Sequence, residues 1–101
     1  MYDSDNLKRL SKLGELAPDA MKTFEAFDNA AMADGAISQK NKELIALGVA
    51  ATTQCPYCLE IHSKRAKKAG ASEAEIAEAM FVAAALRAGA AVTHATHVID
   101  D

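Results

Sequence analysis

Apolar residues recur every three or four positions along each long segment of the chain, which is the periodicity of helices rather than of strands. Ala, Glu, Lys, Leu and Met are frequent in these segments, and all five residue types favour helices. The pattern predicts helical segments at about residues 5–16, 18–34, 38–53, 56–70, 72–88 and 90–99. We therefore expect an all-α protein, folded as one compact helical domain of about five to six helices over residues 1–101.

Local signals mark where these helices begin and end. Pro18 suits the first turn of the second helix, and Ser38 is a candidate N-cap for the third. Ser72 and Glu75 have the spacing of a capping box at the start of the fifth. Gly70 is expected to end the fourth helix, and a glycine at position 89 is expected to separate the last two.

Three of the predicted helices carry apolar faces that we expect to be buried. Met21, Phe24, Phe27 and Ala31 form a stripe on the second helix, which is typical of core packing. The third helix is apolar around most of its circumference, so it should be the central helix of the fold. The segment 72–88 is apolar on nearly every side, which predicts burial in the core or in an interface.

The composition limits the size of the core. Half of the 101 residues are apolar, but only 5% are aromatic and Trp is absent. Ala-rich helices bury little area each, and a chain of this length buries only about two thirds of its unfolded surface. We therefore expect a homo-oligomer, in which contacts between copies bury further apolar surface.

Charge and hydropathy narrow the classes of function and the compartment. The formal net charge is -3, and Lys and Arg are interleaved with Asp and Glu, so we expect no nucleic-acid partner. The N-terminal residues are acidic and polar, and no stretch approaches about 18 uninterrupted apolar residues. We expect a cytoplasmic protein without a membrane partner. In a reducing compartment, two nearby cysteines are redox-active or metal-binding rather than structural.

The run Cys55-Pro56-Tyr57-Cys58 opens a predicted helix and is the strongest chemical signal in the chain. Unpaired backbone N–H groups in the first turn of a helix stabilise a thiolate, which is the nucleophile in thiol chemistry. The spacing also lets the two sulfurs form a disulfide across one helical turn. His62 follows Cys58 by four residues, so its ring can lie near that sulfur as a base. These residues predict a thiol-disulfide redox centre.

Glu43 is distinguished from the other acidic residues by its position. It lies in Lys42-Glu43-Leu44, at the start of an otherwise apolar helical segment that must pack on its neighbours. Its carboxylate either faces the buried side and orients His62, or lies on a solvated face.

A zinc site is the main alternative use of the cysteines. Cys55, Cys58, His94 and His97 together would supply the four N and S ligands that tetrahedral zinc requires. The two histidines have fewer intervening residues than zinc fingers usually show, and the chain between the two halves favours helices without metal. Histidines at a helix end, at a subunit contact or beside the redox pair are the other interpretations.

The site residues resemble the signature of the alkylhydroperoxidase D-like group within the carboxymuconolactone decarboxylase family. Glu43 is followed after eleven residues by Cys55-Pro56-Tyr57-Cys58, and after three more by His62. Two later segments, Gly70 to Ile76 and Thr93 to His97, also look like short members of that family. The resemblance covers about residues 15 to 99.

The resemblance implies an all-helical fold that assembles as trimers or hexamers, and a peroxidase that needs no bound cofactor. It implies that Cys58 attacks the hydroperoxide substrate and that Cys55 resolves the sulfenate as a disulfide. Glu43 and His62 would form the proton relay. An external dithiol or a thioredoxin-type partner would then reduce the disulfide. The sequence itself does not decide which cysteine is the nucleophile.

One position departs from this pattern. Several members of the group carry His immediately before the second Cys, where this chain has Tyr57, a poor base near neutral pH. A slower peroxidase and a protein disulfide reductase therefore both remain open. A carboxymuconolactone decarboxylase-type lyase would need a cation such as Arg87 for its acidic substrate, but leaves the cysteine pair without a role. A non-catalytic oligomeric binding module requires thiols that are inert to oxidants.

Overall fold

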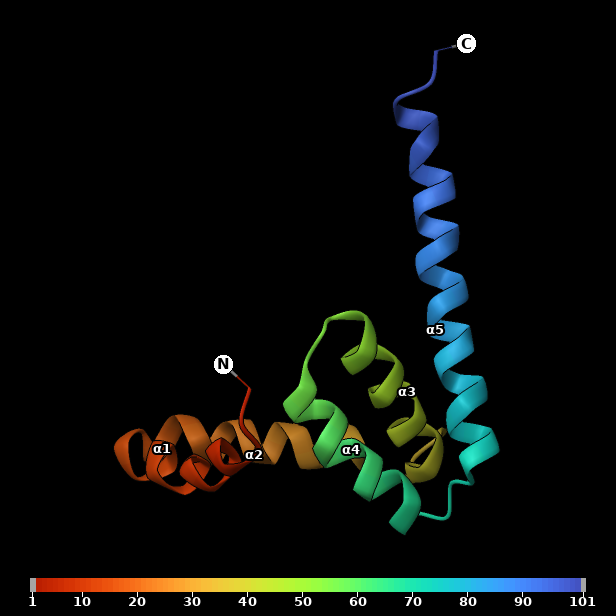
Figure 1. Cartoon of the computed structure of the whole chain (residues 1–101). Coiled ribbons are helices and arrows are strands. Elements are labelled where there is room, and N and C mark those ends of the chain that lie inside the picture. Colours follow the sequence, from red (N-terminus) through yellow and green to blue (C-terminus); the bar gives the residue numbers. More distant parts are fainter. Residues whose placement is uncertain (1, 101) are drawn as a thin grey trace.

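The computed structural model describes residues 2–100, and in that range the chain forms helices and no strand (Figure 1). The elements are η1 (Ser4–Arg9), α1 (Leu10–Leu16), α2 (Pro18–Met32), α3 (Gln39–Thr52), α4 (Pro56–Lys68), α5 (Glu73–His94) and η2 (Ala95–His97), where η denotes a 3₁₀ helix. The prediction of an all-α fold is confirmed.

The core lies where α3 packs between α4 and α5. Leu47 and Ala66 are almost completely buried there, from α3 and α4 respectively, and Ala71 joins them from the connection to α5. Partly buried apolar side chains surround this cluster: Leu44, Leu59, Ile76 and Met80. The apolar pattern of the third predicted helix correctly identified the centre of the fold, and this core holds α3 and α4 together as the frame of the site described below.

The helices of one chain do not close into a compact body. The α1–α2 pair extends to one side of the core, and the C-terminal half of α5 projects away from it (Figure 1). The radius of gyration is 16.9 Å, whereas a compact domain of this length has about 13 Å. Phe81 and Leu86 on α5 are 77% and 69% exposed. The small intrachain core agrees with the composition.

The predicted break at Gly89 is wrong, because α5 continues without interruption from Glu73 to His94. A glycine inside a helix costs only about 1 kcal/mol relative to Ala, and the flanking alanines favour the helix. The predicted last helix is therefore the end of α5 followed by the short η2.

The expectation that the stripe on α2 forms part of the core is also wrong for the single chain. Phe24 and Phe27 are 62% and 72% exposed, and no residue of α2 is fully buried. The reason is that α2 packs mainly on the short α1 and makes only a small contact with α3. The apolar periodicity predicted the helix correctly, but the apolar face of α2 lines a groove and not the core.

By length and composition, the segment from Glu73 to His97 is apolar enough to cross a membrane. Core helices of soluble proteins pass the same test, so this property describes the helix and does not assign it to a membrane.

The carboxylate of Glu75 links the start of α5 to α3. Glu75 accepts hydrogen bonds from Lys40 Nζ at 2.8 Å and from the Ser72 backbone N–H at 2.9 Å, which completes the predicted capping box. The hydrogen bond from Lys40, with that from Ser72, lowers the pKa of Glu75 below its ordinary value of 4.5.

We expect Glu75→Gln to lower the free energy of unfolding at pH 7. Because the pKa of Glu75 is lower in the folded state, its carboxylate stabilises the fold above pH 4.5, and that contribution disappears as the pH falls through the folded-state pKa. Urea unfolding at neutral and acid pH should therefore show a difference from wild type only at the higher pH. Glu73→Gln, in the same first turn, is the control. If it lowers the free energy of unfolding as much as Glu75→Gln does, Glu75 has no specific stabilising role.

Candidate redox site

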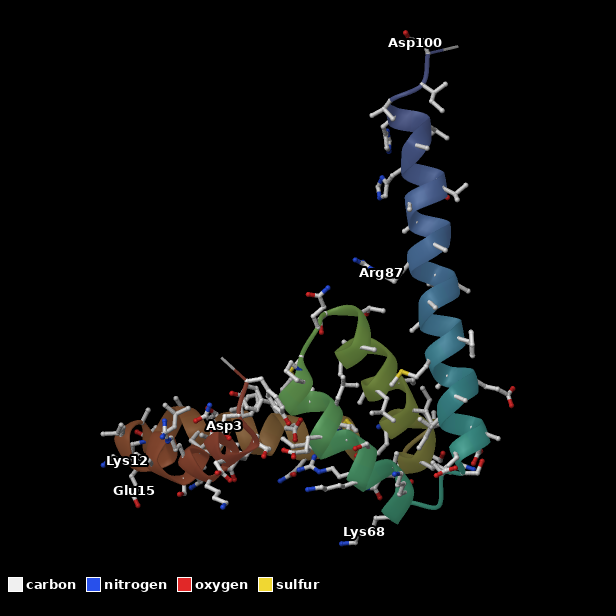
Figure 2. All side chains as sticks on the ribbon, in the orientation of Figure 1. Asp3, Lys12, Glu15, Lys68, Arg87 and Asp100 are labelled. Atoms are coloured by element: carbon white, nitrogen blue, oxygen red, sulfur yellow. A yellow bond between two sulfur atoms is a disulfide. The ribbon has the colours of Figure 1, made fainter. Side chains whose placement is uncertain are left out.

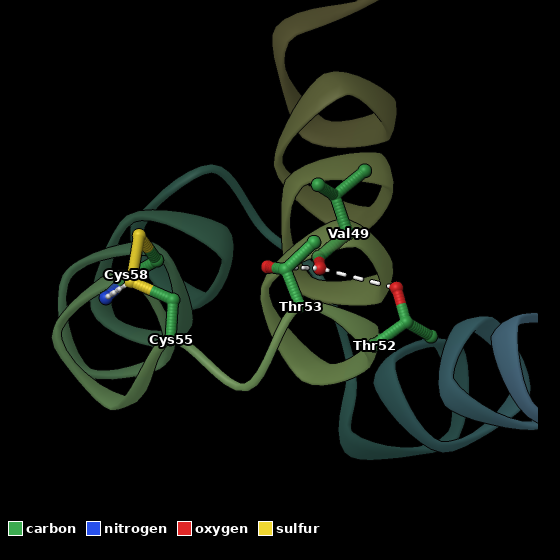
Figure 3. The surroundings of a disulfide bond; sticks show 5 residues. All are labelled: Val49, Thr52, Thr53, Cys55 and Cys58. Atoms are coloured by element: carbon green, nitrogen blue, oxygen red, sulfur yellow. Dashed lines mark hydrogen bonds between the residues drawn. A yellow bond between two sulfur atoms is a disulfide. The ribbon is translucent and has the colours of Figure 1, made fainter.

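The turn between α3 and α4 positions Cys55 at the start of α4. Gln54 has a left-handed backbone conformation with φ of 57°, and the Cys55 N–H donates to the Ala50 carbonyl at 2.9 Å, which ends α3 in a Schellman motif. In Figure 3 the Thr52 and Thr53 hydroxyls also donate to a carbonyl of the last turn of α3, at 3.2 and 2.8 Å. The end of α3 is thus held firmly, and the chain turns directly into α4.

Cys55 is the N-cap of α4 and is joined to Cys58 by a disulfide (Figure 3). The two Cα atoms are 5.3 Å apart, within the usual range for disulfides. The Cys58 N–H donates to the Cys55 sulfur at 3.3 Å, and Pro56 occupies the first turn. Both cysteines are half-buried. The predicted pair therefore lies at the start of a helix, with its sulfurs in bonding position.

Glu43, which is buried, and His62, which is partly buried, form a pair across the contact between α3 and α4. The distance between Glu43 Oε2 and His62 Nδ1 is 2.6 Å, and the side chains are 1% and 17% exposed. A buried carboxylate is costly unless it is hydrogen-bonded. Among the described residues, every buried side-chain N or O atom has a hydrogen-bond partner. Of the two positions considered for Glu43, the buried one facing His62 is therefore the one in the structure.

The contact with Glu43 determines how the His62 ring can act. A carboxylate at Nδ1 holds the ring in one orientation and favours the tautomer with its proton on Nδ1. The other ring nitrogen, Nε2, is then the one available for proton exchange with a thiol or a bound molecule. This is the orienting arrangement that a general base requires.

Cys58 and His62 line the same open groove, whose volume is about 1340 Å³. The groove runs between α4 and the α1–α2 arm, and its apolar side chains include Leu7, Leu10, Met21, Phe24 and Ile61. Of the two cysteines, Cys58 lines it and Cys55 does not. The structure therefore distinguishes the sulfurs, which sequence reasoning could not do.

A second, more polar pocket of about 700 Å³ lies on the other side of Glu43, and Asp34 and Lys68 are among its lining residues. Arg65 and Asp28 line both cavities and form a loose ion pair at 3.9 Å. The Glu43 and His62 pair thus lies between an apolar groove and a polar pocket.

The structure does not bring the C-terminal candidates to the cysteines. Arg87 extends from the part of α5 that projects from the core (Figure 2). The His94 and His97 rings lie further along, with centroids 5.3 Å apart. Within residues 2–100, no group of three His, Cys, Asp or Glu side chains is arranged to hold a metal ion. The four residues of the proposed zinc site are therefore not assembled in this chain.

Sequence reasoning missed a contact between the N-terminal turn and Tyr57, the residue that precedes Cys58. The Tyr57 hydroxyl accepts hydrogen bonds from Asn6 Nδ2 at 2.9 Å and from the Asp3 N–H at 3.3 Å. The Tyr57 ring also packs against Tyr2, whose pKa is raised above 10.0 by desolvation and by the charge of Glu60. No local sequence signal predicts a contact across 51 residues.

Fold and site together define an all-helical protein with a disulfide at the start of α4, and with a glutamate on α3 that pairs with a histidine on the next turn of α4. The model of the carboxymuconolactone decarboxylase family matches residues 18–101. The chain therefore belongs to the carboxymuconolactone decarboxylase family.

Solved structures agree with this assignment. A carboxymuconolactone decarboxylase family protein from Legionella pneumophila is 35% identical, with a TM-score of 0.78 over 81% of this chain and 73% of that one. A protein from Methanobacterium thermoautotrophicum is 32% identical, with a TM-score of 0.79 over 85% of this chain and 97% of that one. Among curated proteins, "Uncharacterized protein 4 in cox locus" of Paracoccus denitrificans is 44% identical, covering 92% of this chain and 81% of its own length.

Proposed function

We propose that the protein is a thiol-dependent hydroperoxide reductase of the alkylhydroperoxidase D-like group, which cycles Cys55 and Cys58 between dithiol and disulfide. One observation carries the proposal: Cys58 and His62 line the same groove, while Glu43 holds His62 from the buried side. This arrangement supports the proposed roles of Cys58 as nucleophile, His62 as base and Glu43 as the group that orients the base. Membership of the family supports the same interpretation at a coarser level.

In the proposed cycle, the Cys58 thiolate attacks one oxygen of the O–O bond. The S–O bond forms as the O–O bond breaks, which gives a sulfenic acid at Cys58 and an alkoxide. The alkoxide takes from His62 Nε2 the proton that this nitrogen accepted when the Cys58 thiol ionised. The Cys55 thiol then displaces water from the sulfenic acid, and the disulfide seen here forms. An external dithiol, free or on a thioredoxin-type partner, reduces the disulfide and is itself oxidised. The protein itself supplies every group of the oxidative half, and no bound cofactor is needed.

The test is consumption of a hydroperoxide by the purified protein with a dithiol as reductant. We expect catalytic turnover that requires both the protein and the dithiol. If hydroperoxide consumption does not exceed that of the dithiol alone, the proposed activity is wrong.

A protein disulfide reductase with the same site is the second candidate. Tyr57 stands at the position where several peroxidases of the group carry an extra relay histidine. The observation that favours this candidate is that the Tyr57 hydroxyl is hydrogen-bonded to Asn6 of the N-terminal turn. Reduction of a protein disulfide at a rate above that of hydroperoxide turnover, with the same dithiol, would favour this candidate.

We further propose that copies of the chain cover the exposed face of α5, giving a trimer or hexamer. Exposed apolar side chains recur along this helix, which is unusual for a monomer: Phe81, Val82, Leu86 and Val92. No residue of α5 is fully buried within the chain, and the C-terminal half of the helix projects away from the core (Figure 1).

We expect Leu86→Lys to reduce the oligomer to smaller species, because a charge would have to be buried at the contact between copies. Light scattering coupled to size-exclusion chromatography measures the mass directly. Leu86→Met, which keeps an apolar side chain of similar volume, should retain the wild-type mass. A monomeric wild-type protein would refute the proposed assembly.

A further inference from the structure

The N-terminal turn η1 is attached to the rest of the fold at the residue between the two cysteines. Tyr57 receives a hydrogen bond from the Asn6 side chain at 2.9 Å and one from the Asp3 backbone at 3.3 Å. The Tyr2 and Tyr57 rings meet edge to face, with centroids 4.8 Å apart. Three N-terminal groups thus converge on one side chain of α4.

The rest of η1 contributes little to holding it in place. Within the described residues, η1 packs on its neighbour α1 and on α4, and none of its side chains is fully buried. A 3₁₀ helix of six residues is not stable by itself. The contacts at Tyr57 are therefore the main tertiary attachment of this segment.

The attached segment forms one wall of the groove that Cys58 and His62 line. Asn6 and Leu7 contribute to the groove from η1, and Leu10 continues the wall from the first residue of α1. The family match begins only at residue 18, so this wall lies outside the matched region. The remaining apolar lining of the groove comes from α2 and α4.

We propose that Tyr57 is a positioning residue, which through Asn6 holds the N-terminal turn as the wall that selects hydroperoxides with a bulky apolar body. This inference rests on the proposed function. An apolar body in the groove would be buried against Leu7 and Leu10 only while the turn is in place, and burial of apolar surface increases affinity. Hydrogen peroxide has no apolar body, so its reaction at Cys58 does not depend on the wall.

The test compares Tyr57→Phe and Asn6→Leu with wild type, using cumene hydroperoxide and hydrogen peroxide with the same dithiol. Loss of a hydrogen bond should raise KM for cumene hydroperoxide about three- to tenfold, with kcat unchanged. The parameters for hydrogen peroxide should stay at their wild-type values. Because Tyr57→Phe already removes the contact that Asn6→Leu removes, the double variant should show no greater loss than Tyr57→Phe alone.

Lys8→Met is the matched control. Lys8 lies in η1 and forms an exposed ion pair with Asp5, and the groove-lining residues do not include it. Lys8→Met should leave KM and kcat for both peroxides at their wild-type values. A readout independent of activity is trypsin cleavage in η1, which should be faster in Tyr57→Phe and Asn6→Leu than in wild type, because the released turn becomes accessible.

The outcomes separate this inference from the function on which it rests. Wild-type turnover of both peroxides, with KM for cumene hydroperoxide unchanged in the variants, would refute the role of Tyr57 and leave the peroxidase intact. An equal loss with both peroxides would also refute it, since that would indicate a general effect on the cysteines. Absence of turnover in the wild type would refute both.

Discussion

Cys58→Ser is expected to abolish hydroperoxide turnover, by at least about 10³-fold, because a serine hydroxyl is not ionised near neutral pH and cannot attack the O–O bond. The groove supports the choice of this sulfur, since Cys58 lines it next to His62 and Cys55 does not. The assay is steady-state consumption of hydroperoxide with a dithiol as reductant, after circular dichroism has shown that the variant keeps its helices.

Cys55→Ser is the informative partner variant. This variant cannot form the disulfide, so it should not turn over hydroperoxide catalytically. It should still react once with hydroperoxide and gain the mass of one oxygen atom at Cys58. If instead Cys58→Ser reacts once with hydroperoxide and gains one oxygen atom at Cys55, while Cys55→Ser does not react, the two cysteines have the opposite roles to those proposed.

His62→Ala should lower kcat/KM by about 10²-fold, the usual contribution of a general acid or base. The reason is geometric, because the ring is held at 2.6 Å from Glu43 and lies one helical turn beyond Cys58.

Two variants control this result. Glu43→Gln keeps the shape of the side chain but removes the charge that orients the ring, so it should reduce kcat/KM by a smaller factor, about tenfold, with the fold intact. Lys64→Ala, on the exposed side of α4, should have no effect. Full activity in both His62→Ala and Glu43→Gln would exclude the proposed relay.

The frame of the site could be predicted from the sequence because its signals are local. Pro56 and the cysteine spacing define the start of α4, and His62 follows one turn beyond Cys58 on the same helix. Glu43 could be singled out because an acidic residue in an apolar helix needs a buried partner, and the structure places it against His62.

The rest of the site depends on contacts between segments distant in sequence. The attachment of Asn6 to Tyr57 leaves no periodic or motif signal, so it could not have been predicted. The apolar stripes of α2 and α5 predicted that these faces would be covered, but not by which surface. Phe24 faces the groove, and Phe81 lies exposed on α5. Apolar periodicity identifies which face of a helix is apolar, but it does not identify the surface that packs against that face.

The most direct test of the central claim is the intact mass and thiol count of the fully reduced protein, before and after one equivalent of hydroperoxide, with metal analysis of the same sample. The proposed redox pair predicts that the protein loses both thiols and the mass of two hydrogen atoms, with no metal bound. Thiols that remain intact in the presence of the oxidant, together with stoichiometric zinc, would contradict it and assign Cys55 and Cys58 a structural role.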